Sequence, residues 1–396
     1  MKFRELIKHK QLIVLGLNSG TSADGLDLAA VKMDLSPTGP KIDCLYGRTV
    51  PYPNLLSMKI IDGIGDRFRS IDEMILLDRR LGVFFGEEAL RTIRLLKRRG
   101  IRIDLIASHG QTVRHLPGKF IHRGKKLSAT LQLGHPESIA CLTGLTTIAD
   151  FRQTDIAMGG EGAPITTEAM HILFSDKKES RLLINIGGIA NYFLFPSARN
   201  HGMISARDCG PGNSLLDILA RRLYGRTFDS GGKLAAKGKI SRRLLTLLLS
   251  DKFLKGHFGV STGRERFGEK FADKTLGFTG QLNLPREDIL ATVTELTAVS
   301  IAKGIARDIS RYKIDKIYLF GGGAKNKYLQ TRLKMNLPQL QFITVDKLGF
   351  NPDYLEAVCY AVMGGLVIHG TRADLSRLTG VAGRTVAGRI VLPAGR

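Results

Sequence analysis

Several features typical of common protein classes are absent from the 396-residue sequence. Tryptophan is missing, which removes one common ring for stacking on sugars or on nucleic-acid bases. No run of about 18 or more apolar residues occurs, so no membrane span is predicted. The four cysteines, Cys44, Cys141, Cys209 and Cys359, are far apart and form neither a CxxC pair nor a zinc-binding spacing. This distribution favours a reduced, cytoplasmic protein, and no set of side chains that would ligate a metal directly is predicted.

Acidic residues are scarce relative to basic ones. Lys and Arg number 59 while Asp and Glu number 36, which gives a formal net charge of +23. Such a charge can favour nucleic acid, anionic membranes or phosphorylated ligands. The basic residues are nevertheless spread along the chain, with only short clusters at 97–99 and 125–126. A generally basic surface is the simpler interpretation, and a nucleic-acid-binding protein remains the alternative.

The order of apolar runs predicts the fold class. Short apolar runs that end in turn residues alternate with longer amphipathic stretches, which is typical of an α/β protein with mixed sheets covered by helices. The predicted strands are 12–17, 26–33, 45–50, 103–107, 129–133, 145–149, 182–186, 191–195, 316–320, 342–345 and 389–392. The predicted helices run from 70 to about 99, from about 285 to 312 and from about 352 to 368, and others begin near 136, 213 and 326. Ser70 and Glu73 have the spacing of a capping box at the start of the first helix, and Gly100 is expected to end it.

A strand, a glycine turn and a second strand occur near the N-terminus and again at 182–195, which suggests a weak internal duplication. The size of the chain favours two domains. We expect the first domain to span 1–149 together with about 380–396, because the C-terminal strand is expected to return to it. The second domain is expected to span 150–379, with the border near Asp150.

Three glycine turns each follow an apolar strand, at 18–22, at 187–188 and at 321–324. Glycine lets the backbone approach a ligand, and successive N–H groups form a site for anions. The first turn lacks the Gly-Lys-Ser/Thr ending of a Walker A motif, and the last lacks the spacing of a dinucleotide fold. Each turn alone could be purely structural. Together they suit a nucleotide, with two turns on its phosphates and one near its adenine.

Two groups of carboxylates accompany these turns. Asp24 and Asp27 follow the first turn and could organise Mg²⁺ through water, although Asp27 could instead hydrogen-bond the turn itself. Asp208 begins the segment Asp-Cys-Gly-Pro-Gly-Asn, just before a predicted helix. We interpret this segment as a turn, because its glycines and proline disfavour a regular helix or strand. There it could accept a proton from water or a hydroxyl group, and an ordinary Asx turn is the alternative.

Three further side chains and one loop could line a site, and each of the three side chains has a structural alternative. His109 is a second candidate base or a structural hydrogen-bonding group. Arg152 could bind an anionic substrate group or pair with Asp155. Glu356, near the start of the last long helix, could bind a ligand or lie on the helix surface. The polar loop 261–266 could also face a ligand.

In combination, the motifs resemble those of the anhydro-N-acetylmuramic acid kinase family over nearly the whole chain. The matching segments are 16–27, 108–112, 150–152, 159–164, 185–191, 208–213, 261–267 and 321–326. The resemblance implies a two-lobed, actin-like ATPase of the hexokinase–actin–heat-shock-chaperone superfamily, with ribonuclease H-like lobes and ATP in the cleft between them. It also implies an enzyme that opens the anhydro ring of 1,6-anhydro-N-acetylmuramic acid with water and phosphorylates O6. The products are N-acetylmuramic acid 6-phosphate and ADP, in the recycling of cell-wall peptidoglycan.

The resemblance assigns roles by position. Asp208 corresponds to the general base that activates water, Glu356 to a substrate contact, and Thr112, Arg152 and Asp155 to further cleft residues. The residues implied to bind ATP are Gly20, Thr21, Ser22, Ala23, Asp24, Gly25, Leu26, Asp27, Gly187, Gly188, Gly322, Gly323 and Asn326. ATP and Mg²⁺ are the implied cofactors. A cytoplasmic homodimer is implied, with no nucleic-acid or membrane partner.

The sequence departs from the family pattern at several positions. Asn18 stands where Met is usual, Ala23 where Leu is usual, Glu161 where Gln is usual and His135 where Asn is usual, and 165–167 reads Ile-Thr-Thr in place of Leu-Val-Pro. Levoglucosan kinases share the chemistry on a sugar without the amide and lactyl groups, and they are the nearest alternative enzymes. An inactive ATP-binding regulator on the same fold is a further alternative, although the presence of Asp208 argues against it.

Overall fold

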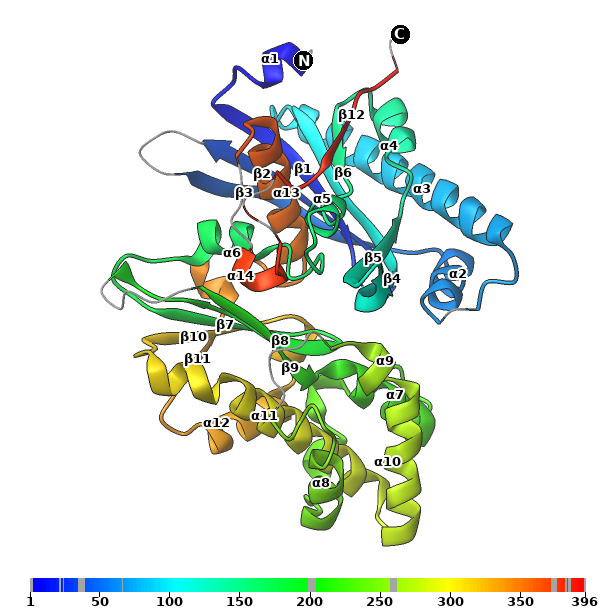
Figure 1. Cartoon of the computed structure of the whole chain (residues 1–396), viewed down its shortest axis with the longest axis vertical. Helices are drawn as coiled ribbons and strands as arrows, with labels where there is room; N and C mark the ends of the chain where they lie inside the picture. Colours follow the sequence, from blue (N-terminus) through cyan, green and yellow to red (C-terminus); the bar gives the residue numbers. More distant parts are fainter. Residues whose placement is uncertain are drawn as a thin grey trace. The chain divides into compact units, whose positions relative to one another are not determined.

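The computed structural model describes residues 3–20, 23, 25–34, 40–65, 67–198, 204–256, 262–371, 376–381, 383 and 386–394. The chain forms two compact units. Unit 1 comprises residues 1–173 and 353–396, and unit 2 comprises residues 174–352. Figure 1 shows the helices and strands of each unit.

Unit 1 is built on a mixed sheet with the order β12-β6-β4-β1-β2-β3, and β5 pairs with β4. The first three strands form an antiparallel meander, whereas β4 runs parallel to β1 and β6 runs parallel to β4. The strands are β1 (Gln11–Ser19), β2 (Gly25–Asp34), β3 (Lys41–Pro51), β4 (Leu105–His122), β5 (Lys125–Leu133), β6 (Thr147–Ala149) and β12 (Arg389–Val391). As expected, the C-terminal strand returns to this unit, where β12 pairs antiparallel with β6.

Helices cover both faces of this sheet. The helices are α1 (Phe3–Leu6), α2 (Asn54–Ile64), α3 (Ile71–Arg98), α4 (Pro136–Thr143), α5 (Gln153–Ala157), α6 (Thr167–Phe174), α13 (Leu355–Ile368) and α14 (Ser376–Thr379), with α6 at the unit boundary. Because side chains alternate along a strand, Leu15 and Leu17 of β1 pack in one core with the apolar stripe of α3. The alternating residues Val14 and Gly16, on the other face of the strand, contact α13.

The predicted start of α3 is confirmed. Ser70 caps the helix, with its side chain accepting a hydrogen bond from the Glu73 backbone N–H. The Glu73 side chain accepts a hydrogen bond from the backbone N–H of Arg69, whereas in an ideal capping box the donor would be the N–H of Ser70. The helix ends at Arg98, and Gly100 adopts a left-handed conformation with φ of 77°.

Unit 2 has a mixed sheet with the order β11-β10-β7-β8-β9. Its strands are β7 (Arg181–Ile186), β8 (Ile189–Phe195), β9 (Ser205–Pro211), β10 (Lys316–Phe320) and β11 (Phe342–Thr344). Its α-helices are α7 (Asn213–Tyr224), α8 (Arg242–Leu249), α9 (Arg264–Phe267), α10 (Glu269–Leu282), α11 (Arg286–Arg311) and α12 (Lys327–Asn336). Short 3₁₀ helices are η2 (Ser230–Gly232), η3 (Ala235–Lys237), η4 (Gly322–Lys325) and η5 (Val345–Leu348). Helix α11 is long and apolar enough to cross a membrane, but 78% of its most apolar window is buried, as in a core helix.

The two sheets share one topology. In unit 1 the order β3-β2-β1-β4-β6 matches β9-β8-β7-β10-β11 in unit 2. In both, the first strand lies centrally, the second and third pair antiparallel on one side, and the fourth and fifth pair parallel on the other. This is the expected ribonuclease H-like arrangement, so the prediction of two α/β lobes of actin-like type is confirmed. The weak repeat in the sequence corresponds to this repeated topology.

The unit boundaries differ from those expected at 149/150 and 379/380. The segment after β6 stays with unit 1 because the Glu161 backbone N–H donates to the Thr379 carbonyl at 2.8 Å. The last long helix also belongs to unit 1, since α13 packs on β1, β2 and β4. Unit 2 is therefore a continuous stretch of chain, whereas unit 1 is formed by two separate stretches.

Candidate functional site

The first glycine turn follows β1 and is held by a chain of hydrogen bonds. The Tyr52 hydroxyl donates to Ser19 Oγ at 2.6 Å, and Ser19 Oγ donates to Gln111 Oε1. Gln111 Nε2 donates in turn to the carbonyl oxygen of Gly20 at 3.2 Å. Ala23 takes a left-handed conformation with φ of 57°, and its carbonyl accepts from Ser57 Oγ at 2.9 Å. The expected ligands Thr21, Ser22 and Asp24 lie outside the described residues.

Asp27 lies on β2 opposite Asn18 of β1, beside this turn. Its Oδ1 accepts a hydrogen bond from Thr49 Oγ1 at 2.6 Å, so part of the carboxylate is engaged by the protein. Within the described part of the chain, no three His, Cys, Asp or Glu side chains come together as a metal-binding group. A single carboxylate fits Mg²⁺, which usually keeps several waters and takes other ligands from phosphates.

Glu356 lies in the first turn of α13, and Asn18 Nδ2 donates to its Oε2 at 2.9 Å. Loss of solvation raises the pKa of Glu356, while the Asn18 hydrogen bond and the positive charge of Arg152 oppose that rise. The side chain is exposed although dense protein surrounds it. Because the carboxylate is exposed, water screens its charge, and the crowded surroundings raise its pKa less than a dry interior would. Glu356 is thus neither a simple surface residue nor a buried one, but is held by Asn18 at the end of β1.

Arg152 is held by hydrogen bonds to His109, Gly162 and the Tyr360 hydroxyl, all in unit 1. Its Nε donates to Nε2 of His109 at 3.1 Å, and its Nη1 donates to the Gly162 carbonyl at 3.3 Å. His109 is buried and stacks on Tyr360 of α13, with ring centroids 4.4 Å apart and an interplanar angle of 18°. Burial and the charge of Arg152 hold the pKa of His109 well below its ordinary value. Because its Nε2 lone pair is occupied by Arg152, the structure favours a structural hydrogen-bonding group over a general base.

Asp155 does not pair with Arg152 as one alternative proposed. Its side chain is fully buried, Oδ2 accepts from the Gly162 backbone N–H at 2.7 Å, and Oδ1 accepts from Thr379 Oγ1 at 2.6 Å. Both oxygens are hydrogen-bonded within the protein, as buried carboxylates usually are. Thr112 lies on β4, half-buried, and its Oγ1 accepts from Gln132 Nε2 at 3.2 Å.

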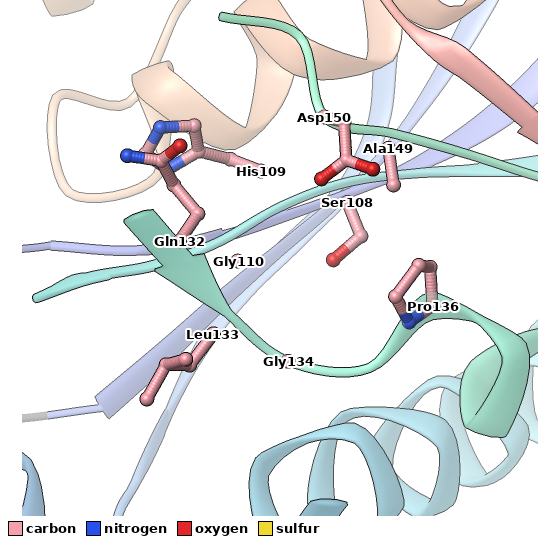
Figure 2. A pocket seen from close by; sticks show the side chains of 9 residues that line it. All are labelled: Ser108, His109, Gly110, Gln132, Leu133, Gly134, Pro136, Ala149 and Asp150. Carbon is pink, nitrogen blue, oxygen red and sulfur yellow. The ribbon is translucent and has the colours of Figure 1, made fainter. Parts of the chain in front are cut away.

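A small pocket with a volume of about 20 Å³, partly open to solvent, lies beside His109 (Figure 2). It is lined by Ser108, His109, Gly110, Gln132, Leu133, Gly134, Pro136, Ala149 and Asp150. The Ser108 hydroxyl is buried and has no hydrogen-bond partner. Asp150 has a positive φ of 56° and forms an ion pair with Arg389, Oδ2 to Nε, at 2.8 Å. The pocket therefore offers an unused hydroxyl close to the His109–Arg152 pair.

In unit 2, Asp208 lies on strand β9, opposite Asn191 of β8. The prediction of a turn without regular structure is therefore wrong. The pairing register shifts between Ala190 and Asn191, so one extra residue of β9 forms a bulge next to Asp208. Bulges change the direction in which a neighbouring side chain points. Oδ2 of Asp208 accepts a hydrogen bond from the Thr262 backbone N–H at 2.7 Å.

Two neighbours of Asp208 have an unsatisfied polar side-chain atom: Asn191, its partner across the strands, and Thr262, its hydrogen-bond donor. Asn191 Oδ1 and Thr262 Oγ1 are buried and have no hydrogen-bond partner. Buried polar groups of this kind usually bind ordered water or a ligand. The sequence pointed to the loop that contains Thr262, although Ser261 lies outside the described residues. No single-residue signal distinguished Asn191, because the strand pairing that places it opposite Asp208 is not visible in the sequence.

The second and third glycine turns come together at one edge of the unit 2 sheet, because β7 and β10 are parallel neighbours. The Gly187 and Gly188 carbonyls accept backbone N–H groups from the start of α7, including Asn213 N–H at 2.8 Å. A Cβ atom at Gly323 would lie 2.2 Å from Ile186 Cγ2, so glycine is required for this approach. Asn326 caps α12, its Oδ1 accepting from the Leu329 backbone N–H at 3.0 Å.

Sequence reasoning also missed Tyr360, Tyr52 and Gln111. Tyr360 follows Glu356 by four residues on a helix, a spacing that places both on the same face and could have identified it. Tyr52, directly after β3, and Gln111 of β4 hold Ser19 from positions distant in sequence, and no local pattern marks them.

Residues 12–393 match the family model described as anhydro-N-acetylmuramic acid kinase. A protein of that name from Caldanaerobacter subterraneus subsp. tengcongensis is 37% identical over 97% of this chain and 98% of its own length. Its namesake from Bacillus cereus is 34% identical over 96% of this chain and 100% of its own length.

Solved structures are more distantly similar. The activator of the 2-hydroxyisocaproyl-CoA dehydratase from Clostridium difficile, with bound ADPNP, is 12% identical, has a TM-score of 0.41 and covers 91% of this chain and 97% of its own. A ROK family glucokinase from Streptomyces griseus is 10% identical, with a TM-score of 0.36, covering 89% of this chain and 98% of its own. The relatives in sequence match at much higher identity and along nearly the whole chain, and they establish that this chain belongs to the anhydro-N-acetylmuramic acid kinase family.

Proposed function

We propose that this chain uses ATP and water to open the ring of 1,6-anhydro-N-acetylmuramic acid and to phosphorylate O6. The products are N-acetylmuramic acid 6-phosphate and ADP, and the reaction serves the recycling of peptidoglycan. The observation that carries the proposal within this family is the position of Asp208, whose carboxylate is fixed by the Thr262 backbone on a bulged strand.

Asp208 acts as the general base in this proposal. It takes a proton from a water molecule while the water oxygen bonds to the anomeric carbon and the bond from that carbon to O6 breaks. The released O6 then bonds to the γ-phosphorus of ATP, whose bond to the β–γ bridging oxygen breaks to release ADP. A placed carboxylate base contributes about 10²–10⁴-fold to such a step. The anomeric carbon has oxocarbenium character in the transition state, so a carboxylate of ordinary basicity suffices.

Backbone groups of the glycine turns bind ATP in this proposal. The first turn, from Gly20 to Asp27, and the second, Gly187–Gly188, would bind phosphates through N–H groups. The third turn, Gly322–Gly323, together with Asn326, would hold the adenosine. Phosphoryl transfer depends mostly on such positioning and on charge neutralisation.

Asp27 and Asp24 would hold Mg²⁺, mainly through water, as the single described carboxylate beside the first turn allows. Bound Mg²⁺ supplies neutralisation of phosphate charge. The Thr49 hydrogen bond keeps the Asp27 carboxylate in one orientation for this role.

Unit 1 residues would bind the sugar. Glu356, oriented by Asn18, would accept hydrogen bonds from sugar O–H or N–H groups. Arg152 has further N–H groups beyond those that contact His109 and Gly162, and its fork geometry suits the lactyl carboxylate of the substrate. Thr112 would add a hydroxyl contact. Part of the +23 net charge would then serve an anionic substrate.

We further propose that the protein works in the cytoplasm as a homodimer, with no nucleic-acid or membrane partner. The cysteines among the described residues are unpaired thiols, which fits a reducing compartment.

ADP release with ATP and Mg²⁺ tests the function directly. The acceptor should be 1,6-anhydro-N-acetylmuramic acid, levoglucosan or no sugar, and the product should be identified by mass. Turnover with the muramic sugar, and a product heavier by one water and one phosphoryl group, is the expected result. Preference for levoglucosan would refute the substrate assignment, and sugar-independent ADP release would refute the kinase reaction.

A further inference from the structure

We propose that His109 is a positioning residue that fixes the guanidinium of Arg152 and thereby sets the preference for an anhydro sugar carrying a carboxylate. This inference rests on the function proposed above and adds a specificity-determining residue to it. The pair joins two distant parts of unit 1, since His109 lies on β4 and Arg152 directly precedes α5.

The contacts of Arg152 explain why His109 matters. Its Nε–H group donates to His109 at 3.1 Å, and Nη1 donates to the Gly162 carbonyl at 3.3 Å. These two bonds involve different nitrogens of one planar group, so together they fix the plane of the guanidinium. Loss of the His109 bond would release the Nε–H edge of the guanidinium, while the contacts with the Gly162 carbonyl and the Tyr360 hydroxyl would remain. Arginine recognises a carboxylate through two parallel N–H bonds, which requires a defined plane.

His109 is itself fixed. It is 6% exposed, and its ring stacks on Tyr360, which is 3% exposed, at a centroid distance of 4.4 Å. Tyr360 also contacts Phe151, the neighbour of Arg152 in the chain, with centroids 5.4 Å apart. Tyr360 thus packs against both His109 and Phe151. The imidazole therefore presents its Nε2 atom to Arg152 in one orientation.

Chemistry requires that His109 be neutral in this arrangement. Arg152 Nε–H is a donor, so His109 Nε2 must be an unprotonated acceptor, and the ring proton then resides on Nδ1. Two ionisable side chains adjoin the ring, Arg152 through its hydrogen bond and Tyr360 through ring stacking, and they come from two other segments of unit 1. The neighbouring positive charge and burial both disfavour a protonated imidazole, so the acceptor persists at neutral pH.

A merely structural histidine and a positioning histidine predict different outcomes. Loss of a structural group would lower activity on every sugar by the same factor. Loss of the Arg152 orientation would lower activity only on a sugar whose carboxylate Arg152 binds. The comparison therefore needs two acceptors, 1,6-anhydro-N-acetylmuramic acid and the same 1,6-anhydro amino sugar without its lactyl ether.

Two variants separate the functions of the imidazole. His109→Phe keeps a flat ring on Tyr360 but removes the acceptor. His109→Gln removes the ring but keeps an amide oxygen that reaches the position of Nε2. We expect His109→Phe to lower kcat/KM for the muramic sugar about 10- to 100-fold, mainly through KM, because one charge-assisted hydrogen bond is lost. For the sugar without the carboxylate the change should stay within about threefold, and His109→Gln should restore most of the preference.

The results distinguish failure of this inference from failure of the proposed function. Wild-type protein that turns over neither sugar would overturn both. Wild-type turnover of the muramic sugar, combined with equal losses on both sugars in His109→Phe, would overturn only the role of His109. Thermal unfolding of each variant identifies a misfolded protein. If His109→Phe does not fold, the sugar preference of His109→Gln decides, and a preference lost in that variant would contradict the inference.

Discussion

Gly16 controls the position of helix α13, and its substitution by alanine gives the most direct test of the packing described above. Gly16 lies on β1, and an added Cβ atom would meet the carbonyl oxygen of Ala357 at 1.9 Å and the backbone nitrogen of Ala361 at 2.9 Å. Both neighbours are backbone atoms of α13, so no rotamer change can relieve the contact. The helix or the strand must move.

The size of the effect follows from these distances. Ordinary non-bonded contacts require about 3.5 Å, so α13 must shift by about 1.5 Å from β1. Overpacking of a core commonly costs about 1–3 kcal/mol, and a backbone neighbour favours the upper end of that range or more. In a domain of this size 1 kcal/mol lowers Tm by about 2–4 °C, so Gly16→Ala should unfold about 6–12 °C lower. The same shift moves Glu356 away from Asn18, so kcat/KM should fall even in the folded variant.

Circular dichroism during heating, together with the ADP-release assay, measures both effects. Gly277→Ala is the matched control, because Gly277 lies within α10 and an added Cβ would meet nothing within 4 Å. That change should be neutral or stabilising by about 0.5–1 kcal/mol, since alanine favours a helix. A Gly16→Ala protein with the melting temperature of wild type, or one destabilised no more than Gly277→Ala, would refute the proposed contact between β1 and α13.

Three further predictions concern the site. Asp208→Asn should lower kcat about 10²–10⁴-fold while ATP binding, measured by calorimetry, persists; near-full activity would show that another group is the base. Asn18→Leu keeps the side-chain volume but removes the hydrogen bond to Glu356, so KM for the sugar should rise about 5- to 10-fold with little change in Tm; an unchanged KM would exclude a role for this bond. Burial and Arg152 lower the pKa of His109 below its ordinary 6.5, so as pH falls below about 6.5 the unfolded chain binds a proton that the folded chain does not. The free energy of unfolding should therefore decrease with falling pH, by up to about 1.4 kcal/mol per pH unit from this group, and urea titrations at several pH values should show a flatter dependence in His109→Phe; identical slopes in the two proteins would contradict a buried neutral His109.

The elements that sequence predicted well are those with a strong local signal. Short apolar runs located β1, β2, β7 and β10 to within two residues, because a buried central strand needs apolar side chains on both faces. The start of α3 was located by Ser70, whose side chain satisfies a helix N–H group without help from distant residues.

Strand β9 was missed for a physical reason. Its residues 205–211 include Gly210 and Pro211, which usually mark turns, and Gly210 does adopt a positive φ of 127°. The segment is nevertheless extended because β8 supplies its hydrogen bonds. Tertiary pairing thus overrides local preference at the residue that carries Asp208.

The contacts that define the candidate site were also invisible in the sequence. The residue types at Arg152, His109 and Glu356 were recognised, but their partners lie 43 positions apart for Arg152 and His109 and 338 positions apart for Asn18 and Glu356. Only the folded sheet brings such residues together. The hydrogen bond that the buried Asp155 carboxylate accepts from Thr379, 224 positions away, was equally invisible.

The discontinuity of unit 1 has a consequence for the order of events during synthesis. Residues 174–352 form a continuous unit, so all its strands leave the ribosome before α13 and β12 are made. In unit 1, by contrast, β1 is the first strand to be made, yet the helix that covers its residues Val14 and Gly16 comes more than three hundred residues later. At about 5–20 residues per second, the uncovered face of this sheet stays exposed for tens of seconds while unit 2 folds. The last part of the chain to be translated therefore completes the unit that was begun first.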